Sequence, residues 1–173
     1  MVGPIRVAIL TISDRSFRGE REDLGGPAVE KALERIPFPT AVVERTVLPD
    51  QRDDIAWNLE RIGDSGVADL VFTTGGTGLG PRDVTPQGTL DAADYEVPGI
   101  GEAMRAATRA AVPAADLSRA TAAVRKRTLV VNLPGSPRGA VECLDVVARL
   151  LPHAVATLRG EDHVPASGRG ATA

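Results

Sequence analysis

The sequence contains few of the residues on which several protein classes depend. Its single cysteine, Cys143, cannot form a disulfide within the chain, so we expect a reducing, cytoplasmic compartment. Aromatic residues make up 3% of the chain, too few for a surface that stacks nucleic-acid bases. The formal net charge of -3 argues against a basic face, and we therefore expect no nucleic acid and no membrane as a partner.

Long apolar segments are absent as well. The longest apolar runs, such as residues 7–10 and 129–133, have the length of a strand and cannot cross a bilayer. Residues 1–9 lack the charged start, apolar middle and cleavage site of a signal peptide. The length of 173 residues suits one domain, which we place at residues 1–160. Residues 161–173 show no periodicity, and we expect them to form a mobile tail.

The sequence does contain an alternation of strand and helix patterns. Strands are expected at residues 5–12, 41–48 and 69–74 and in a β-hairpin of 119–124 with 128–133, and helices at 27–36, 51–62, 85–93, 98–112 and 138–158. This order predicts a three-layer α/β/α fold, in which a mostly parallel mixed sheet with a β-hairpin has helices on both faces.

Polar and glycine-rich loops follow four of the predicted strands. In open α/β sheets, ligands bind at the carboxyl ends of the strands, so these loops are expected to meet at one site. The candidate binding residues in them are Ser13, Asp14, Arg15, Asp50, Thr74, Gly75, Gly76, Thr77, Gly78, Pro134, Gly135, Ser136 and Pro137.

The loop at residues 75–78, Gly-Gly-Thr-Gly, has two possible interpretations. It matches neither GxxxxGK[ST] nor GxGxxG, because the third position of the latter is Pro81. Its backbone amides could converge on an anion, with Thr74 and Thr77 as hydroxyl donors. The alternative is a plain turn between a strand and a helix, which is the favoured interpretation of the glycine run alone.

Two carboxylates change that balance. Asp83 lies close to the glycine loop, where it would repel a phosphate unless a cation sat between them. Asp50 follows another strand and could reach the same crevice. Two carboxylates together with nucleotide phosphates are a usual way to hold Mg²⁺. The alternatives are that Asp50 caps the following helix, and that Asp83 is a turn residue ahead of a helix capped by Thr85.

Nucleophilic catalysis by a cysteine or a histidine is not indicated. Cys143 lies in an apolar helical segment and is expected to be a buried structural thiol. His153 and His163 lie in or near the C-terminal segment, away from the loops, and Trp57 and Tyr95 are expected in the core or at an interface.

Eight short motifs, in this order along the chain, resemble the molybdopterin-binding proteins of the Mog/MoaB type. They are TISDR (11–15), REDLGGP (21–27), LPD (48–50), TTGGTG (73–78), RDVTP (82–86), PGIGEAMR (98–105), LSR (117–119) and NLPGSP (132–137). The resemblance extends over residues 1–160, which it identifies as a molybdopterin-binding domain.

The resemblance implies an activity and an assembly. The family's reaction is the adenylylation of molybdopterin by Mg-ATP with release of pyrophosphate, in proteins that form homotrimers or hexamers and act alongside a molybdenum-insertion protein. It implies that Asp50 and Asp83 are the acidic residues needed for activity and that the loops hold the pterin phosphate and the nucleotide. The alternative is a carrier or scaffold of the MoaB kind, which binds molybdopterin without converting it.

Overall fold

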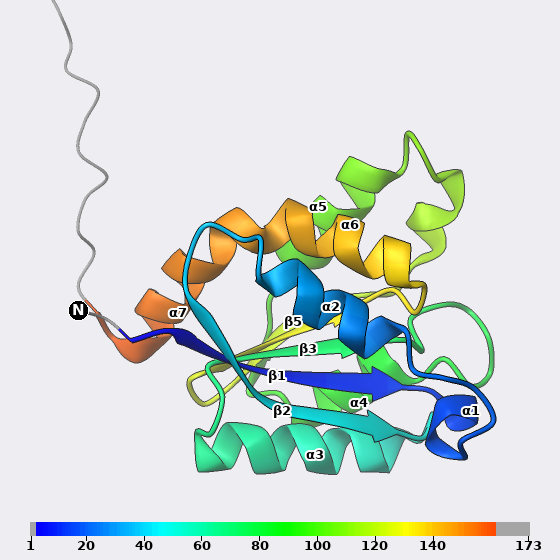
Figure 1. Cartoon of the computed structure of the whole chain (residues 1–173), viewed down its shortest axis with the longest axis horizontal. Helices are drawn as coiled ribbons and strands as arrows, with labels where there is room; N and C mark the ends of the chain where they lie inside the picture. Colours follow the sequence, from blue (N-terminus) through cyan, green and yellow to red (C-terminus); the bar gives the residue numbers. More distant parts are fainter. Residues whose placement is uncertain (1–2, 162–173) are drawn as a thin grey trace, which may run out of the picture.

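The computed structural model describes residues 3–161, which form one six-stranded sheet with the strand order β2-β1-β3-β6-β5-β4 (Figure 1). Neighbours among β1 (Ile5–Ile12), β2 (Thr40–Leu48), β3 (Leu70–Thr74) and β6 (Thr128–Leu133) pair in parallel. The pairs of β5 (Ala122–Arg125) with β6 and with β4 (Tyr95–Glu96) are antiparallel. The sheet is thus mixed and mostly parallel, and the predicted hairpin is confirmed.

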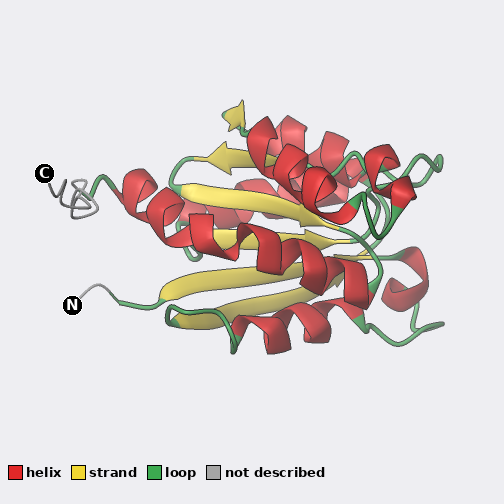
Figure 2. Ribbon diagram, turned by 90° about the horizontal axis from the view of Figure 1, so that it is seen from above, coloured by secondary structure: helices red, strands yellow, loops and turns green. Residues whose placement is uncertain are grey.

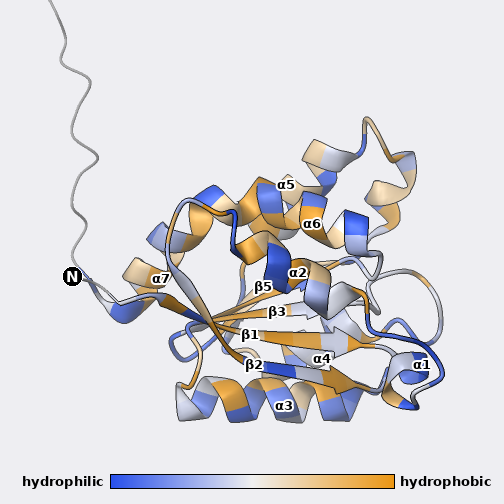
Figure 3. Ribbon diagram, in the orientation of Figure 1, coloured by the Kyte–Doolittle hydropathy of each residue, from blue (hydrophilic) through white to orange (hydrophobic). Residues whose placement is uncertain are grey.

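Helices cover both faces of the sheet (Figures 1 and 2). One face carries α2 (Gly25–Leu33), α5 (Pro98–Thr108), α6 (Pro137–Val147) and α7 (Leu151–Arg159), and the other carries α3 (Arg52–Ser65) and α4 (Thr85–Ala92). Successive side chains of a strand point to opposite faces. In β1, Val7 and Ile9 accordingly join one hydrophobic cluster, whereas Ala8 and Leu10 join the other. The apolar strands lie between more polar outer helix surfaces (Figure 3).

The predicted helix at 138–158 is wrong as a single element. The structure divides it into α6, a 3-10 turn η2 (Ala148–Leu150) and α7. Pro152, the second residue of α7, has no N–H to donate to the preceding turn, so a continuous helix cannot pass through it. The predicted helix at 98–112 also ends early, at Thr108, before a 3-10 turn η1 (Pro113–Leu117).

Two short elements were not predicted from the sequence. The helix α1 (Asp14–Phe17) occupies part of the expected loop after β1, and β4 contains only two residues. Trp57 and Tyr95 are 61% and 55% exposed, so a place in the core is wrong for both. No helix within residues 3–161 has the length and apolar character needed to cross a bilayer. Of the expected tail, residues 162–173 and with them His163 lie outside the described residues.

Candidate functional site

The loops after β1, β2, β3 and β6 meet around a polar cavity of about 380 Å³. Its lining includes Ser13, Asp50, Thr74, Gly75, Gly76, Gly135, Ser136 and Pro137. These residues come from segments far apart in the sequence and meet because parallel strands end at one edge of the sheet, to the right of Figure 1.

A second, more apolar cavity of about 610 Å³ lies beside the first and shares Ser136 with it. Helices α5 and α6 and the turn η1 form its walls, with Met104, Val112 and Leu117 among the apolar side chains. The loop candidates Thr77, Gly78 and Pro134 also line this cavity. Asp14, Arg15 and Asp83 line neither cavity, and the side chain of Arg15 is exposed.

The glycines after β3 are required by the close approach of neighbouring backbone. Gly75 and Gly76 have φ values of 111° and 63°, in the left-handed region that favours glycine. A side chain on Gly75 would collide with the carbonyl oxygen of Ile12, and one on Gly76 with the hydroxyl of Thr85. A Cβ on Gly135 would lie 3.2 Å from the Cα of Gly75, so the two loops touch through their backbones.

Two threonine hydroxyls hold these loops together. Thr85 donates through Oγ1 to the carbonyl of Gly75 at 2.8 Å and is fully buried. It is the first residue of α4 and follows the cap, Val84, so its predicted role as the helix cap is wrong. Thr74 donates through Oγ1 to the carbonyl of Pro134 at 2.8 Å. Its hydroxyl proton therefore connects the two loops and is not directed at an anion.

Asp50 does not cap α3, so that alternative is also wrong. The cap is Gln51, which makes no side-chain capping hydrogen bond. Instead, Asp50 Oδ2 accepts from the backbone N–H of Asp14 at 2.7 Å, and Asp14 Oδ1 accepts from the N–H of Asp50 at 3.0 Å. Burial raises the pKa of the Asp50 carboxyl, opposed in part by the Asp14 N–H and reinforced by the charges of Asp14 and Asp83.

Asp83 is a turn residue, as one interpretation predicted, and its carboxylate also faces the glycine loop. Its Oδ2 accepts from the N–H of Gly80 at 2.8 Å and lies 2.8 Å from the position that a Cβ on Gly78 would take. Arg119 donates through its guanidinium to the carbonyls of Gly78 and Asp83, and these two hydrogen bonds hold the turn in place. Asp50 Oδ1 lies 3.4 Å from the corresponding Cβ position on Gly76. The two carboxylates thus flank one four-residue loop.

This donor set fits a hard cation that keeps part of its coordination for other ligands. Within residues 3–161, no three His, Cys, Asp or Glu side chains gather closely enough to hold a metal by themselves. Mg²⁺ is usually held by one or two carboxylates, with substrate phosphates and water completing its octahedron. Asp50 and Asp83 offer that number of carboxylates.

Asp23 and Arg82 were not singled out from the sequence, although both lie in motifs that carry the resemblance. Asp23 lines the polar cavity and accepts from Thr11 Oγ1 at 3.0 Å and from the N–H of Gly26 at 3.0 Å. Arg82 binds Asp14 through two nitrogens. Burial raises the pKa of the Asp14 carboxyl, but the hydrogen bonds from Arg82 and from the Asp50 N–H outweigh it, so that pKa is lowered. For Asp23, the available signal was its position just before Gly25 and Gly26 in its motif.

The other candidate nucleophiles lie outside this arrangement. Cys143 is buried on α6 at the wall of the apolar cavity, and its burial raises the pKa of the thiol to about 11. The expectation of a buried, unreactive thiol is confirmed. His153 lies on α7 and lines neither cavity.

The fold and the cavities together define an α/β protein that has helices on both faces of its sheet and a candidate ligand site at the carboxyl ends of the strands. A sequence family described as "Probable molybdopterin binding domain" matches residues 8–153. The chain belongs to this molybdopterin-binding domain family.

Characterised relatives extend the comparison. The chain is 38% identical over 156 residues to the molybdopterin adenylyltransferase of Helicobacter pylori, covering 90% of this chain and 89% of that protein. It is 41% identical over 143 residues to the Escherichia coli enzyme of the same name, covering 83% and 73% of the two chains. The crystal structure of the molybdopterin biosynthesis enzyme MoaB from Thermus thermophilus matches with a TM-score of 0.84 and 46% identity, covering 90% and 97%.

Proposed function

We propose that this chain is a molybdopterin adenylyltransferase of molybdenum cofactor biosynthesis, which transfers AMP from Mg-ATP to the terminal phosphate of molybdopterin and releases pyrophosphate. The observation that carries the proposal is the pair Asp50 and Asp83 beside the glycines of the loop at residues 75–78, with Asp50 also lining the polar cavity. The names of the similar enzymes support the same reaction.

The chemistry of this transfer makes modest demands on the protein. An oxygen of the molybdopterin phosphate attacks the α-phosphorus of ATP, and the bond from that phosphorus to the bridging oxygen breaks, so pyrophosphate leaves with the electron pair. The attacking phosphate is already anionic near pH 7, so no general base is needed. Catalysis then depends on positioning and charge neutralisation, which backbone amides and carboxylates around a cation can provide.

Each part of the site receives a role in this proposal. The glycine loops at residues 75–78 and 134–137, with the hydroxyls of Ser13 and Ser136, bind phosphate oxygens. Asp50 and Asp83 hold Mg²⁺, which when bound neutralises charge on the phosphates. The apolar cavity of about 610 Å³ accepts a flat heterocycle, and the shared Ser136 lies where the two substrates meet. Thr77 and Asp14 support the loops around this point.

The cellular setting and the assembly belong to the same proposal. We propose a cytoplasmic enzyme whose domain, residues 1–160, forms a homotrimer or hexamer and hands its product to a molybdenum-insertion protein. Large exposed apolar side chains outside the two cavities, such as Trp57, Leu90 and Tyr95, are available for contacts between subunits. Light scattering after size-exclusion chromatography tests the assembly, and a monomer at micromolar concentration would contradict it.

The test of the activity is incubation of the purified chain with molybdopterin, ATP and Mg²⁺, followed by detection of adenylyl-molybdopterin and pyrophosphate. We expect product from the wild type, and a large loss in Asp50→Asn and Asp83→Asn with molybdopterin binding retained. Binding of molybdopterin by the wild type without product would identify a carrier of the MoaB kind. Failure to bind molybdopterin at all would favour a scaffold.

A further inference from the structure

Arg82 is a cation that immediately precedes Asp83 and binds Asp14, although it lines neither cavity itself. Its Nε donates to Asp14 Oδ2 at 3.0 Å, and its Nη2 donates to Asp14 Oδ1 at 2.9 Å and Oδ2 at 2.7 Å. The Arg82 side chain is 58% exposed and the Asp14 side chain 22%. Within residues 3–161, Asp14 is the one group that accepts hydrogen bonds from Arg82.

The partner of Arg82 is itself tied to a proposed metal-binding carboxylate. Asp14 and Asp50 each accept a hydrogen bond from the other's backbone N–H, at 3.0 and 2.7 Å. The positive charge of Arg82 acts on Asp50 as well. Arg82 therefore lies next to both carboxylates of the site, on the side open to solvent.

The contribution of this ion pair to stability is limited on the side of Arg82. The Arg82 side chain is 58% exposed, so water screens its charge, and a long side chain must be ordered to form the pair. A guanidinium also matches the geometry of a phosphate, to which it can donate two parallel hydrogen bonds. An exposed arginine held beside a phosphate site can thus exchange a carboxylate partner for a phosphate at low cost.

We infer that Arg82 leaves Asp14 when a nucleotide binds and donates to the phosphate oxygens that depart as pyrophosphate. The inference rests on the proposed adenylyl transfer, for which it supplies a binding side chain for the leaving group. Asp14 keeps its backbone hydrogen bonds with Asp50 during the exchange, so the position of Asp50 does not depend on Arg82. Asp14 thereby acts as a positioning residue for Asp50 and as the alternative partner of Arg82.

The test compares equilibrium binding of α,β-methylene-ATP, AMP and pyrophosphate, each with Mg²⁺, to the wild type and to variants by calorimetry. In Arg82→Ala we expect the dissociation constants of the ATP analogue and pyrophosphate to rise about 10-fold or more, and that of AMP less than about 2-fold. Arg82→Lys keeps the charge but loses the paired geometry, so its values should lie between those of Arg82→Ala and the wild type.

The matched control is Arg109→Ala, which removes a guanidinium of similar exposure (55%) from the ion pair with Asp116. Both alanine variants should melt within about 2 °C of the wild type, and only Arg82→Ala should lose affinity for the phosphates. Asp14→Asn removes the competing charge, so pyrophosphate should bind to it at least as tightly as to the wild type.

Each remaining outcome counts against the exchange. If Arg82→Ala binds the ATP analogue and pyrophosphate like the wild type while the wild type adenylylates molybdopterin, the inference is wrong and the proposed function stands. If Asp14→Asn loses as much affinity as Arg82→Ala, the pair acts as one structural unit and no exchange occurs. If the wild type binds no ATP, the proposed function fails and the inference fails with it.

Discussion

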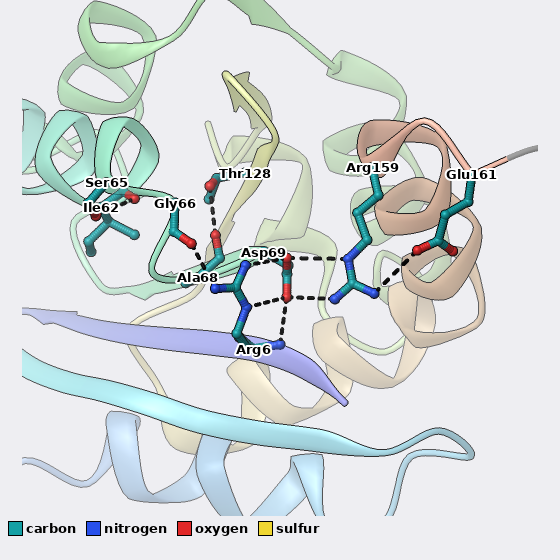
Figure 4. Close-up of polar contacts among 9 residues, drawn as sticks. All are labelled: Arg6, Ile62, Ser65, Gly66, Ala68, Asp69, Thr128, Arg159 and Glu161. Carbon is teal, nitrogen blue, oxygen red and sulfur yellow. Dashed lines mark hydrogen bonds and ion pairs between the residues drawn. The ribbon is translucent and has the colours of Figure 1, made fainter. Parts of the chain in front are cut away.

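Each end of the sheet holds an aspartate in an ion pair with arginine, but the two aspartates differ in their burial and in the number of hydrogen bonds they accept. At the amino end, Asp69 accepts from Arg6 through the backbone N, Nε and Nη2 at 2.9, 3.1 and 2.8 Å. It also accepts from Arg159 Nη2 at 2.8 Å (Figure 4). The Asp69 side chain is 6% exposed. At the carboxyl end, the side chain of Asp14 is 22% exposed and that of Arg82 is 58% exposed.

The amino end is built for stability. Asp69 joins β1, the start of β3 and the last residue of α7, and four hydrogen bonds of 3.1 Å or less occupy its two oxygens. Burial alone would raise the pKa of Asp69, but the hydrogen bonds from Arg6 and Arg159 lower it well below the usual range. Arg6, Asp69 and Arg159 line a cavity of about 590 Å³ beside this cluster, and their charges are already paired with one another.

The carboxyl end has the features expected of a binding site. Burial and neighbouring negative charges raise the pKa of Asp50, so its charged form is less stable in the folded chain than in water. Such an arrangement costs folding stability and is typical of sites that acquire a counter-charge from a ligand. Similar residues thus serve opposite purposes at the two ends, and burial and the number of hydrogen bonds to each carboxylate distinguish them.

The largest effect is expected for Asp50→Asn at the carboxyl end, which should lower the activity without lowering the stability. Asp50→Asn keeps an acceptor for the Asp14 N–H but loses the charge, so we expect adenylylation to fall about 100-fold or more. Its free energy of unfolding should stay equal or rise, because a carboxyl with a raised pKa destabilises the fold at neutral pH. Urea unfolding at pH 7 together with the adenylylation assay checks both. A variant that is less stable and equally active would reverse the assignment of Asp50.

At the amino end the opposite result is expected. Asp69→Ala leaves two guanidinium groups without their shared carboxylate and should lower the free energy of unfolding by about 2–3 kcal/mol. The lower part of the usual range applies because Arg6 is 45% exposed. Activity of the folded fraction at 25 °C should change less than about 2-fold. Asp116→Ala, in the exposed pair with Arg109, is the control and should cost less than about 0.5 kcal/mol.

Acid should weaken the amino end. The pKa of Asp69 is depressed in the folded state, so its contribution is present above the unfolded pKa of about 3.9 and is lost as pH falls through the folded pKa. We expect the urea concentration at the midpoint of unfolding, measured from pH 7 to pH 2.5, to decrease once the pH is below about 4. The decrease should be less steep for Asp69→Asn than for the wild type. Parallel curves for the two proteins would show that Asp69 has the same pKa in both states.

The smallest effect is expected in the hairpin turn that also lies at the amino end. Lys126 has a φ of 54°, a conformation that costs a non-glycine residue energy. Lys126→Gly relieves this strain and keeps the hydrogen bond from the backbone N–H to Asp94. It also raises the conformational entropy of the unfolded chain, which offsets part of the gain. We expect a gain of about 0.5 kcal/mol or less in urea unfolding. A loss larger than this would mean that the Lys126 side chain stabilises the turn.

Much of the fold could be predicted because burial on both faces leaves a simple pattern. Residues 5–12 and 128–133 are mostly apolar and are buried in nearly every position, and each of these strands has the predicted bounds. The break before Pro152 could have been predicted too, since a proline in a long helical pattern interrupts the backbone hydrogen bonds. The two-residue β4 carries no periodicity and forms only because β5 lies beside it.

The site could be predicted less completely, for a physical reason. The convergence of loops follows from parallel strands, and it pointed to Asp50 at the end of one strand and to Asp83 beside the glycine loop of another. The partners of Asp50 and Thr85 depend on contacts between distant segments, so local rules for helix caps assigned them wrongly. Arg82 escaped notice because an arginine in a loop looks like ordinary surface until its partner is known.

The position of Arg159 has a consequence for how the chain folds during synthesis. Asp69 lies 90 residues before this partner, so β1 and β3 can come together long before the carboxylate between them is fully paired. We expect nascent chains that end before α7 to form the sheet but to lack the hydrogen bond from Arg159 to Asp69 at its amino end. The arrival of α7 then completes the pairing of Asp69 and adds the buried side chains of Leu151 and Val155 to the core.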